Sequence, residues 1–69
     1  MEKLSAREYE VLLYLIQGLT NKEIAKKLDI TISTVKIHIS SIKEKLRASN
    51  RTSILYIVLK NKIVDINKM

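Results

Sequence analysis

The pattern Ser/Thr-x-x-Glu at Ser5 and at Thr20, each just before an apolar-periodic segment, limits most strongly what this sequence can fold into. In such a capping box the first side chain accepts a hydrogen bond from the amide of the fourth residue, and the glutamate accepts one from the amide of the first. Proline is absent and glycine occurs once, so long irregular loops are not expected. We predict helices over about residues 6–17 and 21–28, with Gly18 ending the first in the left-handed conformation.

Two further helices are expected over about residues 32–46 and 51–60, capped by Thr31 and Asn50. The earlier of the two carries apolar residues at steps of four, three and four, which is the spacing of one buried helix face. These residues are Val35, Ile39, Ile42 and Leu46. The predicted fold is all-α, a four-helix bundle that contains a helix-turn-helix.

The length of 69 residues is enough for one domain, over residues 1–69, and we expect the tail 65–69 to fray. The absence of cysteine is typical of a reducing compartment, so we predict a cytoplasmic location. The longest apolar runs, residues 11–16 and 54–59, have six residues each. A membrane-spanning helix needs roughly 20, so we expect no membrane contact.

The sequence lacks the residues that catalysis or metal binding requires. It has one histidine, no cysteine, no glycine-rich phosphate loop and no pair of acids placed on one helix face. His38 lies beside the buried stripe, where a histidine is more often a packing residue or a phosphate donor than a metal ligand. We therefore expect no enzyme activity, no metal and no cofactor.

Positive charge is concentrated in the middle of the chain. The net charge is +6, and residues 20–51 carry eight cations against three anions. Such a segment could attract nucleic acid, an anionic membrane or an acidic protein, and it is about as often an ordinary solvated surface. Geometry has to distinguish these alternatives.

The short helix 21–28, the tight connection and the longer helix 32–46 have the arrangement of a helix-turn-helix, whose second helix enters the major groove. Away from its buried stripe this second helix carries Lys36, Ile37 and Ser40. Lysine can donate to guanine, serine can donate or accept at several base edges, and an exposed isoleucine can contact a thymine methyl group. We predict that these three residues read bases.

Helix N-termini offer free amide groups to phosphates, so two of them are candidate contacts with the DNA backbone. The residues concerned are Thr20, Asn21 and Lys22 on one side and Asn50, Arg51 and Thr52 on the other. Thr20 and Asn50 also have a purely structural explanation as caps, and the two roles are compatible.

The helix 51–60 is apolar on every side between residues 54 and 59, so it cannot be an ordinary one-sided surface helix. One side must pack on the rest of the bundle, and the other is exposed unless a partner covers it. We predict a homodimer, at least on DNA, through Tyr56, Ile57 and Lys60. The alternative is a protein-interaction module that recruits another partner through this helix, with the lysines serving only solubility.

Four segments carry a resemblance to a known family: L-S-A-R-E-Y-E-V-L, G-L-T-N-K-E-I-A-K-K-L, I-T-I-S-T-V-K-I-H-I-S-S-I-K-E-K-L and N-R-T-S. The chain resembles the LuxR/GerE-type helix-turn-helix domain, the DNA-binding output module of many bacterial regulators. The resemblance runs nearly end to end. It implies a transcriptional regulator that binds double-stranded DNA near a promoter and helps or blocks RNA polymerase, either alone or as the output domain of a larger protein.

The resemblance also assigns roles to single residues. It implies that the third helix reads DNA, through Lys36, Ile37 and Ser40, and that the fourth carries the dimer contact. The backbone-contacting positions that it implies are Asn21, Lys22, Thr34 and Lys43. It further implies that Glu8 and Arg51 are partners that tie the first helix to the fourth.

Several positions depart from the family pattern, among them Ile54 and Val58, which stand where alanine is frequent. Arg47 and Lys62 stand where glycine is frequent, so the ends of the third and fourth helices either close differently or cost about 1 kcal/mol each in a left-handed conformation. Ser40 stands where a basic residue is frequent, which implies weaker electrostatic binding than a lysine would give.

Overall fold

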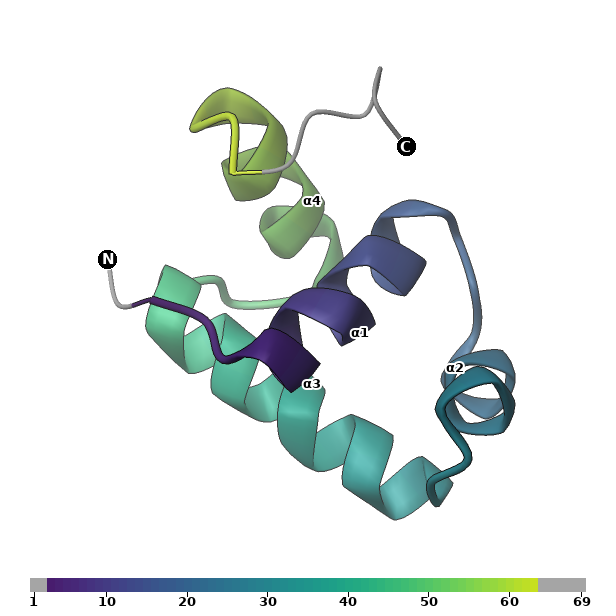
Figure 1. Cartoon of the computed structure of the whole chain (residues 1–69). Coiled ribbons are helices and arrows are strands. Elements are labelled where there is room, and N and C mark those ends of the chain that lie inside the picture. The colour runs from purple at the N-terminus through teal and green to yellow at the C-terminus, as the bar shows by residue number, and fades with distance from the viewer. Residues whose placement is uncertain (1–2, 64–69) are drawn as a thin grey trace.

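The computed structural model describes residues 3–63, and within that range it contains four α-helices and no strand, which confirms the predicted all-α class (Figure 1). Three helices have the predicted bounds, and the first ends one residue earlier because Gln17 is its C-terminal cap. The expected fraying of residues 65–69 lies outside the described residues. The helices are α1 Ala6–Ile16, α2 Asn21–Leu28, α3 Ile32–Leu46 and α4 Arg51–Lys60.

Both predicted capping boxes form. The amide of Glu8 lies 3.1 Å from the Ser5 hydroxyl, and the amide of Glu23 lies 3.2 Å from the Thr20 hydroxyl. In the reverse direction each glutamate carboxylate accepts from the amide of its cap at 2.8 Å. The starts of α1 and α2 are therefore set by local hydrogen bonds that the sequence encodes directly.

Several helix ends close through left-handed residues. Gly18 has a φ of 87°, and Asp29, Arg47 and Lys62 have φ values of 56°, 56° and 54°. Arg47 and Lys62 thus adopt the left-handed conformation without being glycine, at a cost of roughly 1–2 kcal/mol each. The ends of α3 and α4 therefore close in the left-handed conformation that glycine would adopt, and they incur its cost.

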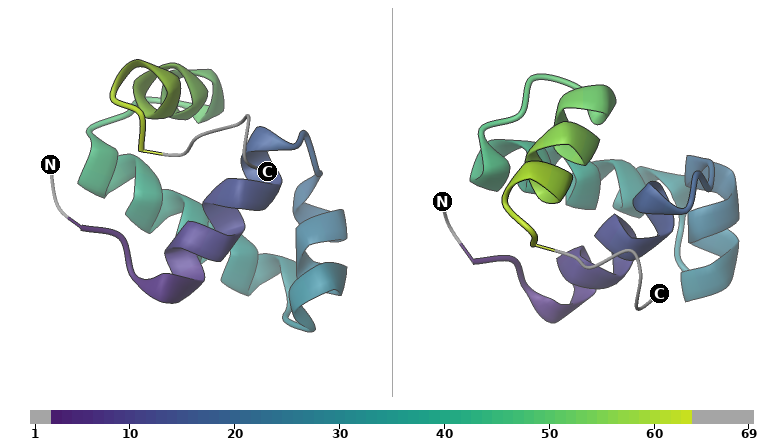
Figure 2. Two further views of the ribbon diagram at one scale, coloured as in Figure 1. Left: turned by 45° about the horizontal axis from the view of Figure 1, so that its top comes forward. Right: turned by 90° about the horizontal axis from the view of Figure 1, so that it is seen from above.

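The helix α3 contacts each of the other three helices (Figure 1). The helix α2 packs near the start of α3 and α4 nearer its end, while the first residues of α2 and α4 meet through Arg51 (Figure 2). No helix within residues 3–63 is both long and apolar enough to cross a membrane. The buried hydrophobic core consists of Val11, Leu12, Leu15, Ile24, Ala25, Val35, Ile39, Ile42, Leu46, Ile54 and Val58.

Candidate nucleic-acid interface

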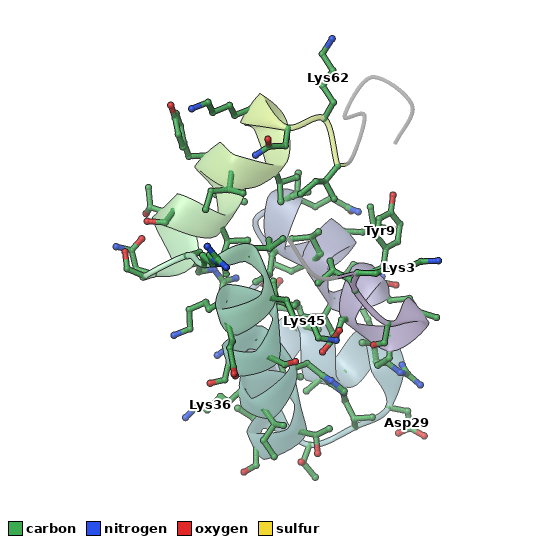
Figure 3. The ribbon with its side chains drawn as sticks, turned by 90° about the vertical axis from the view of Figure 1, so that its left-hand side faces the viewer. Lys3, Tyr9, Asp29, Lys36, Lys45 and Lys62 are labelled. Atoms are coloured by element: carbon green, nitrogen blue, oxygen red, sulfur yellow. The ribbon has the colours of Figure 1, made fainter. Side chains whose placement is uncertain are left out.

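The helix α3 has a buried face and a solvent face, as its sequence pattern predicted. The stripe of Val35, Ile39, Ile42 and Leu46 lies in the core. Lys36, Ile37 and Ser40 are all exposed, and 67% of Ile37 is accessible to solvent. Lys36 extends outward from α3 into solvent (Figure 3). An isoleucine held this far from the core contributes little to folding, so its surface is available for a partner.

The start of α3 is closed by two threonines. The amide of Thr34 lies 3.1 Å from the Thr31 hydroxyl, and the two hydroxyl oxygens are 2.9 Å apart. Thr34 is half-buried, and so is Lys43, another predicted backbone contact. The Thr34 hydroxyl can still accept a hydrogen bond or donate one, because a hydroxyl has one proton and two lone pairs.

The N-termini of α2 and α4 are joined by one arginine. The Nη1 atom of Arg51 donates to Asn21 Oδ1 at 2.9 Å, and its Nη2 atom donates to the carbonyl oxygen of Leu19. Thr20 caps α2, while Lys22 is exposed. The sequence predicted Asn21 and Arg51 as separate contacts with the DNA backbone. The structure brings them together, so that one guanidinium has a fixed position beside the start of α2.

A shallow surface depression of about 590 Å³ connects this arginine to α3. Three cations border it, and its floor includes Ile32, an exposed side chain that the sequence analysis did not single out. The signal was present, because Ile32 lies four residues before Lys36 and so shares its side of the helix. The lining residues are Gly18, Leu19, Thr20, Asn21, Lys22, Ile32, Lys36 and Arg51.

The implied partnership of Glu8 and Arg51 is wrong. Glu8 is buried, and its Oε1 atom lies 2.7 Å from Lys45 Nζ, while its Oε2 atom accepts from the Ser41 hydroxyl. Both partners come from α3, because α3 is the helix that crosses the start of α1, whereas Arg51 lies over the start of α2. Glu8 therefore ties α1 to α3 and not to α4.

These hydrogen bonds stabilise the ionised form of Glu8. The Lys45 ammonium contributes most, followed by the Ser41 hydroxyl and the Ser5 amide, and together they lower the pKa of Glu8 from 4.5 to about 2. Burial alone would raise this pKa, so the hydrogen bonds outweigh desolvation.

Acid is expected to weaken the fold through this carboxylate. Because its pKa is lower in the folded chain, its contribution is complete above about pH 4.5 and is lost as the pH falls towards 2. We expect the free energy of unfolding to decrease by about 2 kcal/mol over that range, after allowance for the solvent that screens the half-exposed Lys45. Urea unfolding at several pH values measures the decrease. Glu8→Gln should flatten the profile, and an equally steep profile in that variant would contradict the assignment.

The helix α4 leaves an apolar surface uncovered. Ile54 and Val58 are fully buried, whereas 63% of Tyr56 and 50% of Leu59 are exposed. The Lys60 ammonium lies 5.7 Å from the centre of the Tyr56 ring. We call Tyr56, Leu59 and Lys60 the α4 patch. Ile57, predicted to lie in a dimer contact, is half-buried against the core at the edge of this patch.

His38 is half-buried on α3, beside the buried stripe. In the part of the chain that the structure describes, no three residues among histidine, cysteine, aspartate and glutamate lie close enough together to hold a metal ion. Three features of the described surface could meet DNA or a protein partner: the exposed face of α3, the cationic depression beside it and the α4 patch.

Comparison with known sequences relates these features to a protein family. Residues 2–58 match the family model described as bacterial regulatory proteins, luxR family. The transcriptional regulatory protein LiaR of Bacillus subtilis is 45% identical over 64 residues, which are 93% of this chain and 30% of LiaR. The response regulator protein VraR of Staphylococcus aureus is 40% identical over 64 residues, which are 93% of this chain and 31% of VraR.

One solved structure resembles this chain in both fold and sequence. The crystal structure of the response regulator ChrA of a heme-sensing two component system matches with a TM-score of 0.85 and 41% sequence identity. The match covers 93% of this chain and 32% of the ChrA chain. The chain thus spans about a third of the length of each of these proteins.

Proposed function

The chain belongs to the luxR family of bacterial regulatory proteins, and on this premise we propose that it regulates transcription by binding specific sequences of double-stranded DNA in the cytoplasm. The helix α3 would enter the major groove with Lys36, Ile37 and Ser40 towards the bases. The observation that carries the proposal is the exposure of these three side chains opposite the buried stripe of the same helix. LiaR and VraR, by their names a transcriptional regulatory protein and a response regulator, support it.

We propose that phosphates of one strand lie along the cationic depression. Lys22, Lys36 and Arg51 border it, and the N-terminal residues of α2, a helix end that favours anions, also line it. Arg51 is already held by Asn21 and the Leu19 carbonyl, so little side-chain entropy is lost when it meets a phosphate. Thr34 and Lys43 would contact the backbone further along α3.

Selection of bound sequences from a random pool of duplex DNA tests the proposal directly. We expect enrichment of a common half-site, and of pairs of half-sites about 10 bp apart or a multiple of that if two copies bind together. Failure to enrich any sequence at moderate salt would count against sequence-specific binding. It would favour the alternative class, a protein-interaction module whose lysines serve only solubility.

Replacing Lys36 with alanine is expected to weaken binding to the selected site by about tenfold, since a specific contact with guanine is worth roughly 1–3 kcal/mol. Loss of this base contact should also relax sequence preference, whereas loss of a phosphate contact such as Lys22 would reduce the slope of log affinity against log salt by about 0.9. Fluorescence anisotropy at several salt concentrations measures both quantities. Lys26→Ala is the matched control, because Lys26 is an exposed lysine of α2 outside the predicted interface. Equal effects of the two substitutions would contradict the assignment of Lys36.

We propose that the α4 patch pairs two copies of the chain on adjacent half-sites. Its two exposed apolar side chains lie at a spacing of three residues on one helix face, which is the pattern of a helix-to-helix contact. A bound dimer of this kind would contact RNA polymerase or exclude it from a promoter. The alternative occupant is a different protein that docks on the same patch.

Tyr56→Glu is expected to weaken dimers at least tenfold without unfolding the domain, because it places a charge in an apolar contact but leaves the core intact. Sedimentation of the free protein and of its complex with a two-site DNA gives the dimer affinity. Gln17→Glu introduces the same charge at the exposed C-terminal cap of α1 and serves as the control. An unchanged mass distribution for Tyr56→Glu would exclude the α4 patch as the homodimer contact.

A further inference from the structure

The contact between α1 and α3 contains one buried charge. Among the described residues Glu8 is the only charged side chain that is buried, with 6% of its surface exposed. Its carboxylate accepts hydrogen bonds from Lys45 Nζ at 2.7 Å, from the Ser5 amide at 2.8 Å and from the Ser41 hydroxyl. Figure 3 shows Lys45 turned inward from α3, in contrast to Lys36. One cation of α3 is thus paired within the contact between α1 and α3.

The position of the Glu8 carboxylate is fixed from the α1 side. It belongs to the capping box of that helix, so the hydrogen bond from the Ser5 amide holds it against the backbone. On the other side Ser41 and Lys45 are four residues apart, so they lie one above the other on the same face of α3. Two successive turns of α3 therefore bond to the same carboxylate, that of Glu8, which α1 holds in place.

Apolar packing alone would define the rotation of α3 less strictly. The hydrophobic contribution is non-directional and depends on the area removed from water, whereas a hydrogen bond requires a donor–acceptor distance of about 3 Å and weakens steeply at angles below about 120°. The stripe of Val35, Ile39, Ile42 and Leu46 supplies the first kind of contact. Glu8 supplies directional hydrogen bonds, and only to the side of the stripe that carries Ser41 and Lys45. These bonds therefore favour one rotation of α3 about its axis over slightly different rotations.

We propose that Glu8 is a positioning residue for DNA reading: by holding Ser41 and Lys45 it sets the rotation of α3 about its own axis, and it removes Lys45 from the set of cations that meet DNA. This inference rests on the proposed function. A helix with side chains has a radius of about 5–6 Å, so a rotation of about 20° moves the tip of a side chain by about 2 Å. That displacement is enough to break hydrogen bonds from Lys36 and Ser40 to base edges.

The first test compares specific with non-specific binding at a temperature well below the melting temperature. Glu8→Gln keeps the shape of the side chain and an acceptor for the Ser5 amide, but removes the charge that holds Lys45. We expect the ratio of affinities for the selected and a scrambled DNA to fall by about tenfold, as for the loss of one base contact. Val11→Ala, a core substitution on the same helix, is the control for lost stability and should leave the ratio unchanged. Equal ratios for the two variants would overturn the proposal.

The second test concerns the charge of Lys45. Lys45→Met keeps most of the apolar stem and removes the ammonium, and we expect it to leave the salt slope of DNA binding unchanged. Lys22→Ala, a predicted loss of one phosphate contact, should reduce the slope by about 0.9 in the same assay. A reduction of the same size for Lys45→Met would show that Lys45 meets a phosphate. The proposal that Glu8 keeps Lys45 away from DNA would then be wrong.

The third test needs no DNA. Residual dipolar couplings of backbone amides give the orientation of α3 relative to α1 in the wild-type chain and in Glu8→Gln. We expect a changed orientation or increased averaging of the couplings of α3, and couplings that fit the same arrangement of helices would overturn the proposal. If the wild-type chain selects no DNA sequence, the proposed function fails while this measurement still decides whether Glu8 positions α3.

Discussion

Replacing Ile42 with alanine is expected to lower the free energy of unfolding by about 3–4 kcal/mol, the largest effect of any substitution on α3 that we predict. Ile42 is fully buried in the middle of the stripe by which α3 packs on the rest of the bundle. Truncation removes apolar contacts and leaves a cavity that the surrounding helices can fill only in part. A chain of this size has a total stability of roughly 3–10 kcal/mol, so a large share of it would be lost.

The same residue type on the same helix provides the control. Ile37 is 67% exposed, and Ile37→Ala is expected to change the free energy of unfolding by less than about 0.5 kcal/mol. Ile37 is one of the three residues proposed to read bases. We therefore expect Ile37→Ala to weaken sequence preference in DNA binding while the fold stays intact. Urea unfolding followed by circular dichroism measures the first comparison. Similar stability losses for the two variants would mean that the two faces of α3 are assigned incorrectly.

Glu8→Ala is expected to cost about 3 kcal/mol, the second-largest effect. The substitution removes the glutamate half of a capping box, the hydrogen bond from Ser41 and the ion pair with Lys45 at once. Lys45 is only partly buried and can turn to solvent, which keeps the loss from being larger. The free energy of unfolding at neutral pH is again the quantity to measure.

Glu23→Ala distinguishes the contribution of Glu8 to capping α1 from the contribution of its contacts with α3. Glu23 completes the same kind of capping box at the start of α2, with the same 2.8 Å hydrogen bond from the amide of its cap, but its side chain is exposed and no hydrogen bond joins it to another helix. It should therefore show the effect of capping alone, and its loss should be clearly smaller than that of Glu8→Ala. Equal losses would mean that the contacts of Glu8 with α3 contribute nothing to stability.

Much of the fold was predictable because it depends on neighbours in the sequence. The starts of α1 and α2 follow from side chains that bond to amides three residues away, and the predicted bounds of α2, α3 and α4 were confirmed. The division of α3 into a buried and an exposed face follows from helical spacing, which needs only the periodicity of apolar residues. The roles of Lys36, Ile37 and Ser40 in reading bases remain predictions.

The partners of charged side chains were not predictable in the same way. Arg51 was expected to pair with Glu8, but it lies beside Asn21, and Glu8 pairs with Lys45. The separations along the chain are 30 and 37 residues, so only the crossing of the helices decides which groups meet. Helical spacing puts Lys43 and Lys45 about 200° apart, on opposite flanks of the buried stripe, but it does not say which flank meets α1.

The sequence by itself therefore determined the four helices, their caps and the buried stripe of α3, because hydrogen bonds and apolar spacing within a helix are local. Only the tertiary structure decided that Arg51 closes the depression beside α2, that Lys45 faces inward to Glu8, and that Tyr56 and Leu59 of α4 stay exposed while Ile54 and Val58 are buried. The physical reason is that these features depend on how rigid helices cross, and the core contacts that set the crossing come from all four helices together.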